Sequence, residues 1–151
     1  MAAEIIRPAT LRDVVDIVPR LRQSDIDECE ALAGKGSVLR MAVATVVGSV
    51  IAMTYVRDGK VTAVFGVAGR LLDEEGSPWM FGTDDIVGRS VVREGRRHVP
   101  MMLRLFKRLS NVVDTRNEKS IRWLKSLGFK FEKAVPVGPS GVLFYPFSMG
   151  D

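Results

Sequence analysis

The residues best suited to bind a charged ligand lie in one basic segment, residues 89–108. Pro100 suits the first turn of a helix, so the residues before it are expected to form a loop that leads into a helix N-terminus. Free backbone N–H groups and the helix dipole make such a place an anion site, and Gly95 would let the backbone approach a phosphate closely. The segment contains one acidic residue, Glu94, against these basic side chains: Arg89, Arg93, Arg96, Arg97, Arg104, Lys107 and Arg108, with the chain's single histidine, His98. The sequence therefore predicts an anion-binding loop at Arg93, Gly95, Arg96, Arg97 and His98.

Two other interpretations of this segment stay open. A run of basic residues can be a solvated surface without a ligand. A nucleic-acid site is the other alternative, but the segment has no interleaved aromatic residues for base stacking, and it is one loop rather than a stripe. Nucleic acid is therefore disfavoured as a partner.

Two adjacent carboxylates, Asp84 and Asp85, follow a predicted strand and are the candidates for a general base. Neighbouring carboxylates raise one another's pKa, which suits a base at neutral pH. The alternative for such a pair is a turn or a helix cap. Cys29 could accept an acyl group as a nucleophile, but a lone cysteine in an amphipathic helix is more often part of the core. One cysteine and one histidine exclude an internal disulfide and leave no metal-ligand cluster.

The stretch "NVVDTRNEKSIRWLKSLGFKFEK", Asn111 to Lys133, predicts a strand, a capped helix and a second strand. Thr115 and Glu118 have capping-box spacing, with Asn117 as an alternative cap. The apolar side of the helix is Ile121, Leu124 and Leu127, and Gly128 supplies the left-handed residue that ends it.

The rest of the chain predicts an α+β domain that spans residues 1–151. A strand at Glu4–Arg7 precedes a helix capped by Thr10, and a second helix runs from Ser24 to about Ala33. Residues 37–48 could be a helix or an apolar strand, and a helix is favoured because 50–57 makes the better strand. Further strands are expected at 50–57 and 60–67, joined by a turn at Asp58-Gly59, then at "SPWMFGT", near 130–133 and at 142–147.

Composition indicates a soluble protein that lies in the cytoplasm. The longest apolar stretch, Met41 to Tyr55, is interrupted by Gly48 and polar residues, so no membrane span is expected. The N-terminus "MAAEIIRPAT" lacks the basic and apolar regions of a signal peptide. The formal net charge is +4, too small to name a partner by itself.

The helix of the C-terminal third resembles the C-terminal motif of the GNAT N-acetyltransferase superfamily. The matching residues are Asn117, Ser120, Trp123, Leu124, Leu127, Gly128 and Phe129. The opening "IIRPATLRDVVDIV" is similar to the first strand and helix of that superfamily, and the order of elements is similar over nearly the whole chain. More narrowly, "FGTDDI", "REGRR", "DTRNEKSIRWLKSLGF" and "GVLFYPF" resemble GNAT-like proteins of tailed phages (podoviruses), some of which are internal virion proteins.

The resemblance implies a mixed, mostly antiparallel twisted sheet flanked by helices, with splayed central strands that hold acetyl-CoA. Its pantetheine would pair with the third strand of the meander near Met80 to Thr83, including Phe81. Its pyrophosphate would lie at Arg93 to Val99, and Asn117 and Ser120 would face the far end of the cofactor. Acceptor pockets in this fold are built by segments that correspond here to Gln23–Ser37 and Val135–Gly141.

Two departures from the family pattern bear on catalysis. The pyrophosphate loop of the family is Arg/Gln-x-x-Gly-x-Gly/Ala, whereas this chain has "REGRRHVP" with one glycine. Many family members carry a tyrosine that protonates the CoA thiolate, and Leu124 stands at that position. Water, Ser120 or Tyr145 would have to act instead.

Two functions follow from the resemblance. The first is an acetyl-CoA-dependent N-acyltransferase, encoded by a phage, that acetylates an amine of a small molecule or of a protein such as a host protein. The alternative is an inactive binding module of the same fold, which acts in the virion or on a host protein in the host cytoplasm.

Overall fold

The computed structural model describes residues 3–86 and 88–151, and for residues 88–92 only the backbone. The strands are β1 (Glu4–Pro8), β2 (Ser49–Arg57), β3 (Lys60–Ala68), β4 (Glu75–Gly82), β5 (Arg108–Asp114), β6 (Lys130–Phe131), β7 (Val135–Val137) and β8 (Val142–Gly150). The helices are α1 (Leu11–Ile17), a 3₁₀ turn at Val18–Arg20, α2 (Gln23–Ala33), α3 (Val38–Val47), α4 (Gly88–Leu105) and α5 (Glu118–Ser126).

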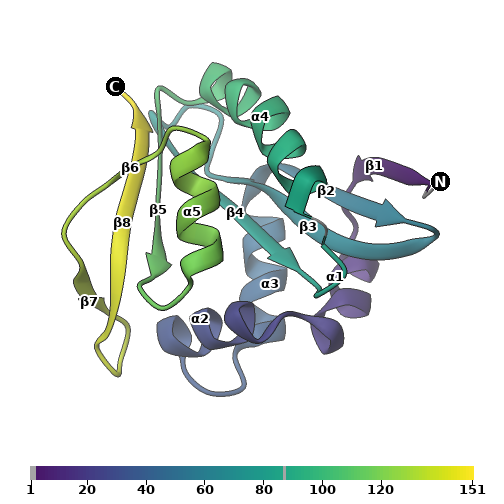
Figure 1. Ribbon diagram of the computed structural model, residues 1–151, viewed down its shortest axis with the longest axis horizontal. Helices are drawn as coiled ribbons and strands as arrows, with labels where there is room; N and C mark the ends of the chain where they lie inside the picture. The colour runs from purple at the N-terminus through teal and green to yellow at the C-terminus, as the bar shows by residue number, and fades with distance from the viewer. Residues whose placement is uncertain (1–2, 87) are drawn as a thin grey trace.

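The eight strands form one sheet in the order β1-β2-β3-β4-β5-β8-β6, with β7 also paired to β8 (Figure 1). Neighbouring strands are antiparallel except β4 and β5, which are parallel. This central pair is short, because only Glu75 with Arg108 and Gly76 with Leu109 are in register. Beyond Gly76 the two strands separate, so the sheet consists of two halves joined at one end.

Helices cover both faces of the sheet. Figure 1 shows α4 and α5 in front, with α1, α2 and α3 behind. The front core includes Phe106, Leu109 and Phe147, and the back core includes Ile17 and Val64. The two layers meet at the gap between β4 and β5, so a ligand in that gap could reach both.

Local sequence accounts for most of these elements. Asp58 and Gly59 both have positive φ (51° and 77°), which is the geometry of a tight turn between antiparallel strands. The side chain of Thr10 caps α1 together with Asp13. Residues 38–47 form a helix, which confirms the favoured alternative. The helix α2 begins at Gln23, one residue before the predicted Ser24, and ends at Gly34 as expected.

One predicted boundary is wrong. The basic segment is not a loop that leads to Pro100, because α4 already begins at Gly88 and Pro100 lies inside it. Proline is tolerated there at the loss of one backbone hydrogen bond, to the carbonyl group four residues earlier. The preference of proline for a first turn therefore did not set the start of this helix. The short strand β7, which contains Pro136, was not predicted.

Among the described residues, no helix has both the length and the hydrophobicity needed to cross a bilayer.

Candidate functional site

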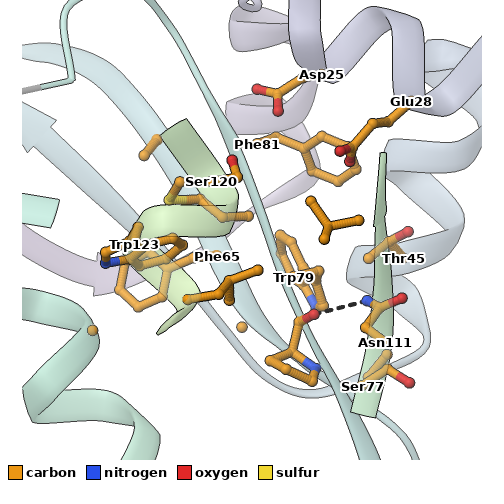
Figure 2. A pocket seen from close by; sticks show the side chains of 18 of the residues that line it. Asp25, Glu28, Thr45, Phe65, Ser77, Trp79, Phe81, Asn111, Ser120 and Trp123 are labelled. Carbon is orange, nitrogen blue, oxygen red and sulfur yellow. Dashed lines mark hydrogen bonds between the residues drawn. The ribbon is translucent and has the colours of Figure 1, made fainter. Parts of the chain in front are cut away.

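The open edge of β4 is the starting point of the site. On the side that faces β5, alternate residues of β4 present their backbone groups, beginning with Gly76, which pairs with Leu109. The next is Pro78, whose carbonyl group accepts a hydrogen bond of 2.8 Å from Nδ2 of Asn111 (Figure 2). A side chain of β5 thus replaces the backbone pairing at the point where the strands separate.

The far end of this edge is closed by α2. The N–H group of Gly82 donates to Oδ2 of Asp25 (2.8 Å), and its carbonyl group accepts from the N–H group of Arg22 (2.9 Å). Met80 lies between the two occupied positions, Pro78 and Gly82. By the same alternation, the N–H and C=O groups of Met80 face the gap. The predicted backbone site at Met80 to Thr83 is therefore reduced to Met80.

A cavity of about 350 Å³ fills the gap and extends to both faces of the sheet. Its walls come from α2, α3, β2, β3, β4, β5, β8, α4 and α5. Figure 2 labels ten of its residues: Asp25, Glu28, Thr45, Phe65, Ser77, Trp79, Phe81, Asn111, Ser120 and Trp123. The volume lies in the range of small-ligand sites. Parts of the chain that are far apart in the sequence thus meet at one place.

On the front face, α4 and α5 approach each other at Gly95. A Cβ atom at this position would lie 3.0 Å from the methyl groups of Leu127 and 3.1 Å from the ring of Trp123, so these side chains would have to shift slightly to admit one. His98 also lines the cavity; its ring contacts that of Phe65 edge-on at 5.0 Å and lies 3.2 Å from a carboxylate oxygen of Glu94. Of the five residues predicted to bind an anion, Gly95 and His98 line the cavity.

The three arginines of the predicted anion loop are exposed residues of α4 and do not line the cavity. Arg93 forms an ion pair with Glu4 (2.8 Å), which is one of the chain's own acids. Arg96 and Arg97 have no ion-pair partner among the described residues. The argument from free backbone N–H groups at Arg93 to Val99 was wrong, because in the middle of a helix these groups bond to the preceding turn.

The start of α5 shows which of the two candidate residues caps the helix. Asn117 is the N-cap and its side-chain oxygen accepts from the N–H group of Ser120 (3.3 Å). Asn117 and Ser120 both line the cavity, as does Leu124, which is 8% exposed and part of the front core. A packed hydrocarbon side chain thus stands where many members of the resembled superfamily carry the tyrosine that protonates the CoA thiolate.

Four other predicted residues lie outside the cavity. Thr83 is buried and bonds to the carbonyl group of Thr62 through both its N–H group and its hydroxyl group. Asp84 and Asp85 are exposed in the turn after β4, and Asp85 pairs with Lys60 (3.5 Å). Tyr145 packs against Phe131 on β6, with 6.2 Å between the ring centroids. The geometry thus favours the turn interpretation of the Asp pair.

Sequence reasoning missed Glu28 on α2, one of the acidic residues that line the cavity, with Asp25 and Glu94. Its Oε1 accepts from the N–H group of Asp114 (3.1 Å) and from Nδ2 of Asn117 (3.2 Å). Burial raises the pKa of Glu28 to about 7, against the lowering effect of these hydrogen bonds. No sequence signal distinguished Glu28 from the other acids of α2, since the cavity is assembled by distant segments.

Cys29, the neighbour of Glu28, also lines the cavity, but its thiol is unsuited to nucleophilic catalysis. Burial and the nearby carboxylate of Asp25 raise the pKa of Cys29 to about 12. At neutral pH the thiol stays protonated, and the thiol form is a poor nucleophile. The prediction that Cys29 belongs to the core agrees with its burial.

Comparison with known proteins gives matches by structure. No family profile and no curated protein matches the sequence. An acetyltransferase of the GNAT family from Streptococcus pneumoniae has a TM-score of 0.68 and 14% identity, over 98% of this chain and 99% of the other. A putative acetyltransferase from Salmonella typhimurium, solved with acetyl-CoA, has a TM-score of 0.67 and 18% identity, over 98% and 94%.

A third similar structure is the microcin C7 self-immunity acetyltransferase MccE, solved in complex with acetyl-CoA and AMP. It has a TM-score of 0.70 and 13% identity, over 98% of this chain and 92% of the other. At these identities the likeness establishes the fold alone. The chain has the GNAT fold, a mostly antiparallel open sheet of eight strands flanked by helices, which confirms the predicted fold class.

Proposed function

We propose that this chain is an acyl-CoA-dependent N-acyltransferase, which moves an acetyl group directly from acetyl-CoA to an amine. The observation that carries the proposal is the cavity that crosses the sheet where β4 and β5 separate, with the peptide groups of Met80 facing it. Two of the similar structures hold acetyl-CoA.

The residues present fit the slim part of an acyl-CoA. The walls of the cavity are mainly apolar, with Phe65, Val99 and Met102 on the front side, and the peptide groups of Met80 offer one donor and one acceptor to an extended amide chain. Asn117 and Ser120 are polar groups at the start of α5. The N–H groups of the first turn of α4, from Gly88, have no partner within the helix and would be offered to an anion, in place of those predicted at Arg93 to Val99.

When bound, acetyl-CoA supplies an acetyl group activated as a thioester. The protein's contribution is then to hold the amine and the thioester together in a gap shielded by helices, which alone supplies a large part of the rate. Leu124 cannot protonate the leaving sulfur. Ser120 is the residue of α5 whose hydroxyl group lines the same cavity. We therefore assign it the role that the tyrosine has in many family members, which is to protonate the sulfur.

Thermal unfolding with and without acetyl-CoA tests this proposal. A ligand that binds only the folded state stabilises it by about 2.7 kcal/mol at a hundredfold excess over its Kd. We expect acetyl-CoA and CoA to raise the Tm. No rise at millimolar acetyl-CoA would remove the cofactor site and leave the chain a binding module.

Two charge reversals on α4 refine the same experiment. Residues are spaced about 100° apart around a helix, so Arg96 flanks the side of Gly95 that faces α5, whereas Arg97 lies on the opposite side. Both are exposed. We expect Arg96→Glu to weaken the shift caused by acetyl-CoA, with Arg97→Glu as the matched control. Equal shifts in the two variants would exclude Arg96 as a contact of the cofactor phosphates.

The second candidate function is a GNAT-fold module that binds a partner without turnover, and the observation in its favour is the buried Leu124. On the sequence resemblance to phage proteins, such a module would belong to a virion or act on a host protein. A raised Tm with acetyl-CoA, together with release of free CoA in the presence of an amine, would exclude this alternative.

A further inference from the structure

We propose that the back half of the cavity is the acceptor site, that its ligand is a primary aliphatic amine on a slim apolar arm, and that Glu28 takes the proton from this amine. This inference rests on the proposed function and adds the class of acceptor and a catalytic residue. It starts from the side of the gap that α2 and α3 cover, opposite to α4 and α5 (Figure 1).

The position of Glu28 is fixed by groups from across the gap. Both hydrogen bonds from β5 and α5, at 3.1 and 3.2 Å, reach the same oxygen, Oε1. The other oxygen, Oε2, accepts no hydrogen bond from the described residues. Figure 2 shows the carboxylate beside Phe81, on the side of α2 that borders the gap. One oxygen therefore orients the side chain and the other can accept from a ligand.

The walls next to Glu28 select the shape of the acceptor. They are Cys29 and Leu32 on α2, Met41 on α3, and Trp79 and Phe81 on β4. Trp79 and Phe81 are packed, with their ring centroids 5.7 Å apart, and Nε1 of Trp79 is bound to Ser49 (2.8 Å). Apolar walls beside the carboxylate, two of them packed rings, suit an ammonium group on a hydrocarbon arm. We expect the rings to exclude an arm that is branched next to the nitrogen.

The charges around Glu28 favour a cation rather than an anion. The groups that face it are Asp25 on α2, Asp114 at the end of β5 and Arg116 in the following turn. Arg22 also lines the cavity, but it is held by Asp25 (2.9 Å), and Arg116 is held by Asp114. Both cations near Glu28 are thus neutralised by other carboxylates. An incoming ammonium group would supply the counter-ion that Glu28 lacks.

Glu28 also has the acidity that a base at neutral pH needs. Since burial sets its pKa at about 7, the carboxylate is half ionised at neutral pH and holds a proton more firmly than an exposed glutamate does. Hydrogen bonds from the N–H groups of Asp114 and Asn117 stabilise the charged form and keep the pKa from rising further.

The proposed step moves one acetyl group and releases one proton. The carboxylate of Glu28 removes one proton from R–NH₃⁺, and the lone pair of the neutral nitrogen attacks the thioester carbonyl carbon. A C–N bond forms and the C–S bond breaks, with its electron pair going to sulfur. The hydroxyl group of Ser120 protonates this thiolate and regains a proton from the nitrogen, and Glu28 releases its proton to solvent. The products are the N-acetyl amine, CoA and one proton.

The experiment measures release of free CoA from acetyl-CoA between pH 6 and 10, with n-pentylamine as the small amine and a blocked lysine peptide as the protein source of the same chemistry. tert-Pentylamine, of the same composition but branched at the carbon next to nitrogen, is the matched control. We expect kcat/KM of the wild type for an unbranched amine to rise up to about pH 7 and then to level off. The branched amine should not react.

Glu28→Gln keeps an oxygen for both hydrogen bonds but cannot take a proton. We expect this variant to retain the Tm rise caused by acetyl-CoA, to lose about 10²-fold in kcat/KM at pH 8, and to gain activity steadily towards the pKa of the free amine. Asp27→Asn, one residue earlier on α2 and outside the cavity, is the control and should behave as the wild type. A purely structural role for Glu28 would leave the pH profile of Glu28→Gln unchanged.

The outcomes separate this inference from the proposed function. If acetyl-CoA raises the Tm but neither amine is acetylated, the acceptor site is wrong and the cofactor site stands. If an amine is acetylated and Glu28→Gln has the wild-type pH profile, Glu28 is not the base. If acetyl-CoA gives no Tm rise, both proposals fall. Acetylation of the peptide alone, or of n-pentylamine alone, tells which source of amine the site accepts.

Discussion

The buried and half-buried carboxylates of this chain differ in their counter-ions, and Glu28 stands apart. The guanidinium group of Arg7 lowers the pKa of Asp13, and that of Arg116 lowers the pKa of Asp114. Asp25 is held by Arg22, although burial still raises its pKa. Among the described residues, Glu28 forms no ion pair, so burial dominates. Its carboxylate is therefore the one whose charge the folded state disfavours without a compensating cation.

Replacing Glu28 should change how stability depends on pH. The pKa of Glu28 rises from 4.5 to about 7 on folding, so the folded state binds more protons between these values, and the free energy of unfolding falls as pH rises through this window. Glu28→Gln removes that fall. We expect the free energy of unfolding of Glu28→Gln, minus that of the wild type, to increase by on the order of 2–3 kcal/mol between pH 4.5 and pH 8.

Thermal or denaturant unfolding at both pH values measures this difference. Since 1 kcal/mol shifts the Tm of a protein of this size by roughly 2–4 °C, the change is large enough to see. Asp27→Asn serves as the control for loss of a charge on the same helix. A difference between variant and wild type that stays constant with pH would mean that the pKa of Glu28 is not raised.

At the scale of elements, Asn117 connects the start of α5 with α2. Its oxygen caps α5 by accepting from Ser120, and its Nδ2 donates to Glu28. One side chain thus fixes both the helix and the carboxylate across the gap. The sequence motif marked Asn117 but not this second contact.

Two substitutions of Asn117 separate its roles. Asn117→Ala loses the cap and should lower the free energy of unfolding by about 1 kcal/mol. Asn117→Asp keeps a capping oxygen, but it removes the donor to Glu28 and adds a negative charge beside it, so the pKa of Glu28 should rise above its wild-type value. Carboxyl NMR titration of Glu28 measures this rise, and an unchanged titration would show that Asn117 does not influence the carboxylate.

The element that sequence reasoning placed wrongly is α4. Pro100 and the preceding glycine and arginines were interpreted as a loop before a helix, and the helix in fact starts twelve residues earlier, at Gly88. A proline inside a helix loses one hydrogen bond, which the packing of Met102 and Phe106 in the front core offsets. Packing is not visible in local sequence, so the helix start, with its free N–H groups, was assigned to the wrong turn.

At the scale of the whole molecule, the two halves of the sheet are joined at Glu75 and Gly76. The ring of Phe106 lies directly over Gly76, and a side-chain carbon there would come within 2.5 Å of it. Phe106 is 1% exposed and cannot move away without disturbing the front core. This close contact fixes the short paired part of β4 and β5, beyond which the gap opens.

A methyl group at Gly76 should therefore destabilise the whole fold. We expect Gly76→Ala to lower the free energy of unfolding by about 1–3 kcal/mol, the usual effect of overpacking, and Ser77→Ala, at the next residue, to lower it little. Denaturant unfolding compares the two. If Gly76→Ala were as stable as Ser77→Ala, the junction would tolerate movement of Phe106, and the gap would be less rigid than the structure implies.

The sequence by itself determined the fold class and most elements, because turns, caps and apolar periodicity act over a few residues. Asp58-Gly59, Thr10 and Gly34 each specify a local backbone geometry, and the motif from Asn117 to Phe129 identified the superfamily fold. These signals do not depend on the rest of the chain.

Only the tertiary structure decided which side chains meet. It brought Glu28, Met80, Gly95 and Asn117 to one cavity and left Asp84, Asp85, Arg93 and Arg97 on the surface. The physical reason is that the cavity exists where two strands separate after one short contact, and its walls come from segments as far apart in the sequence as Arg22 and Phe147. Burial, which gives Glu28 its raised pKa, is a property of that assembly and not of any local pattern.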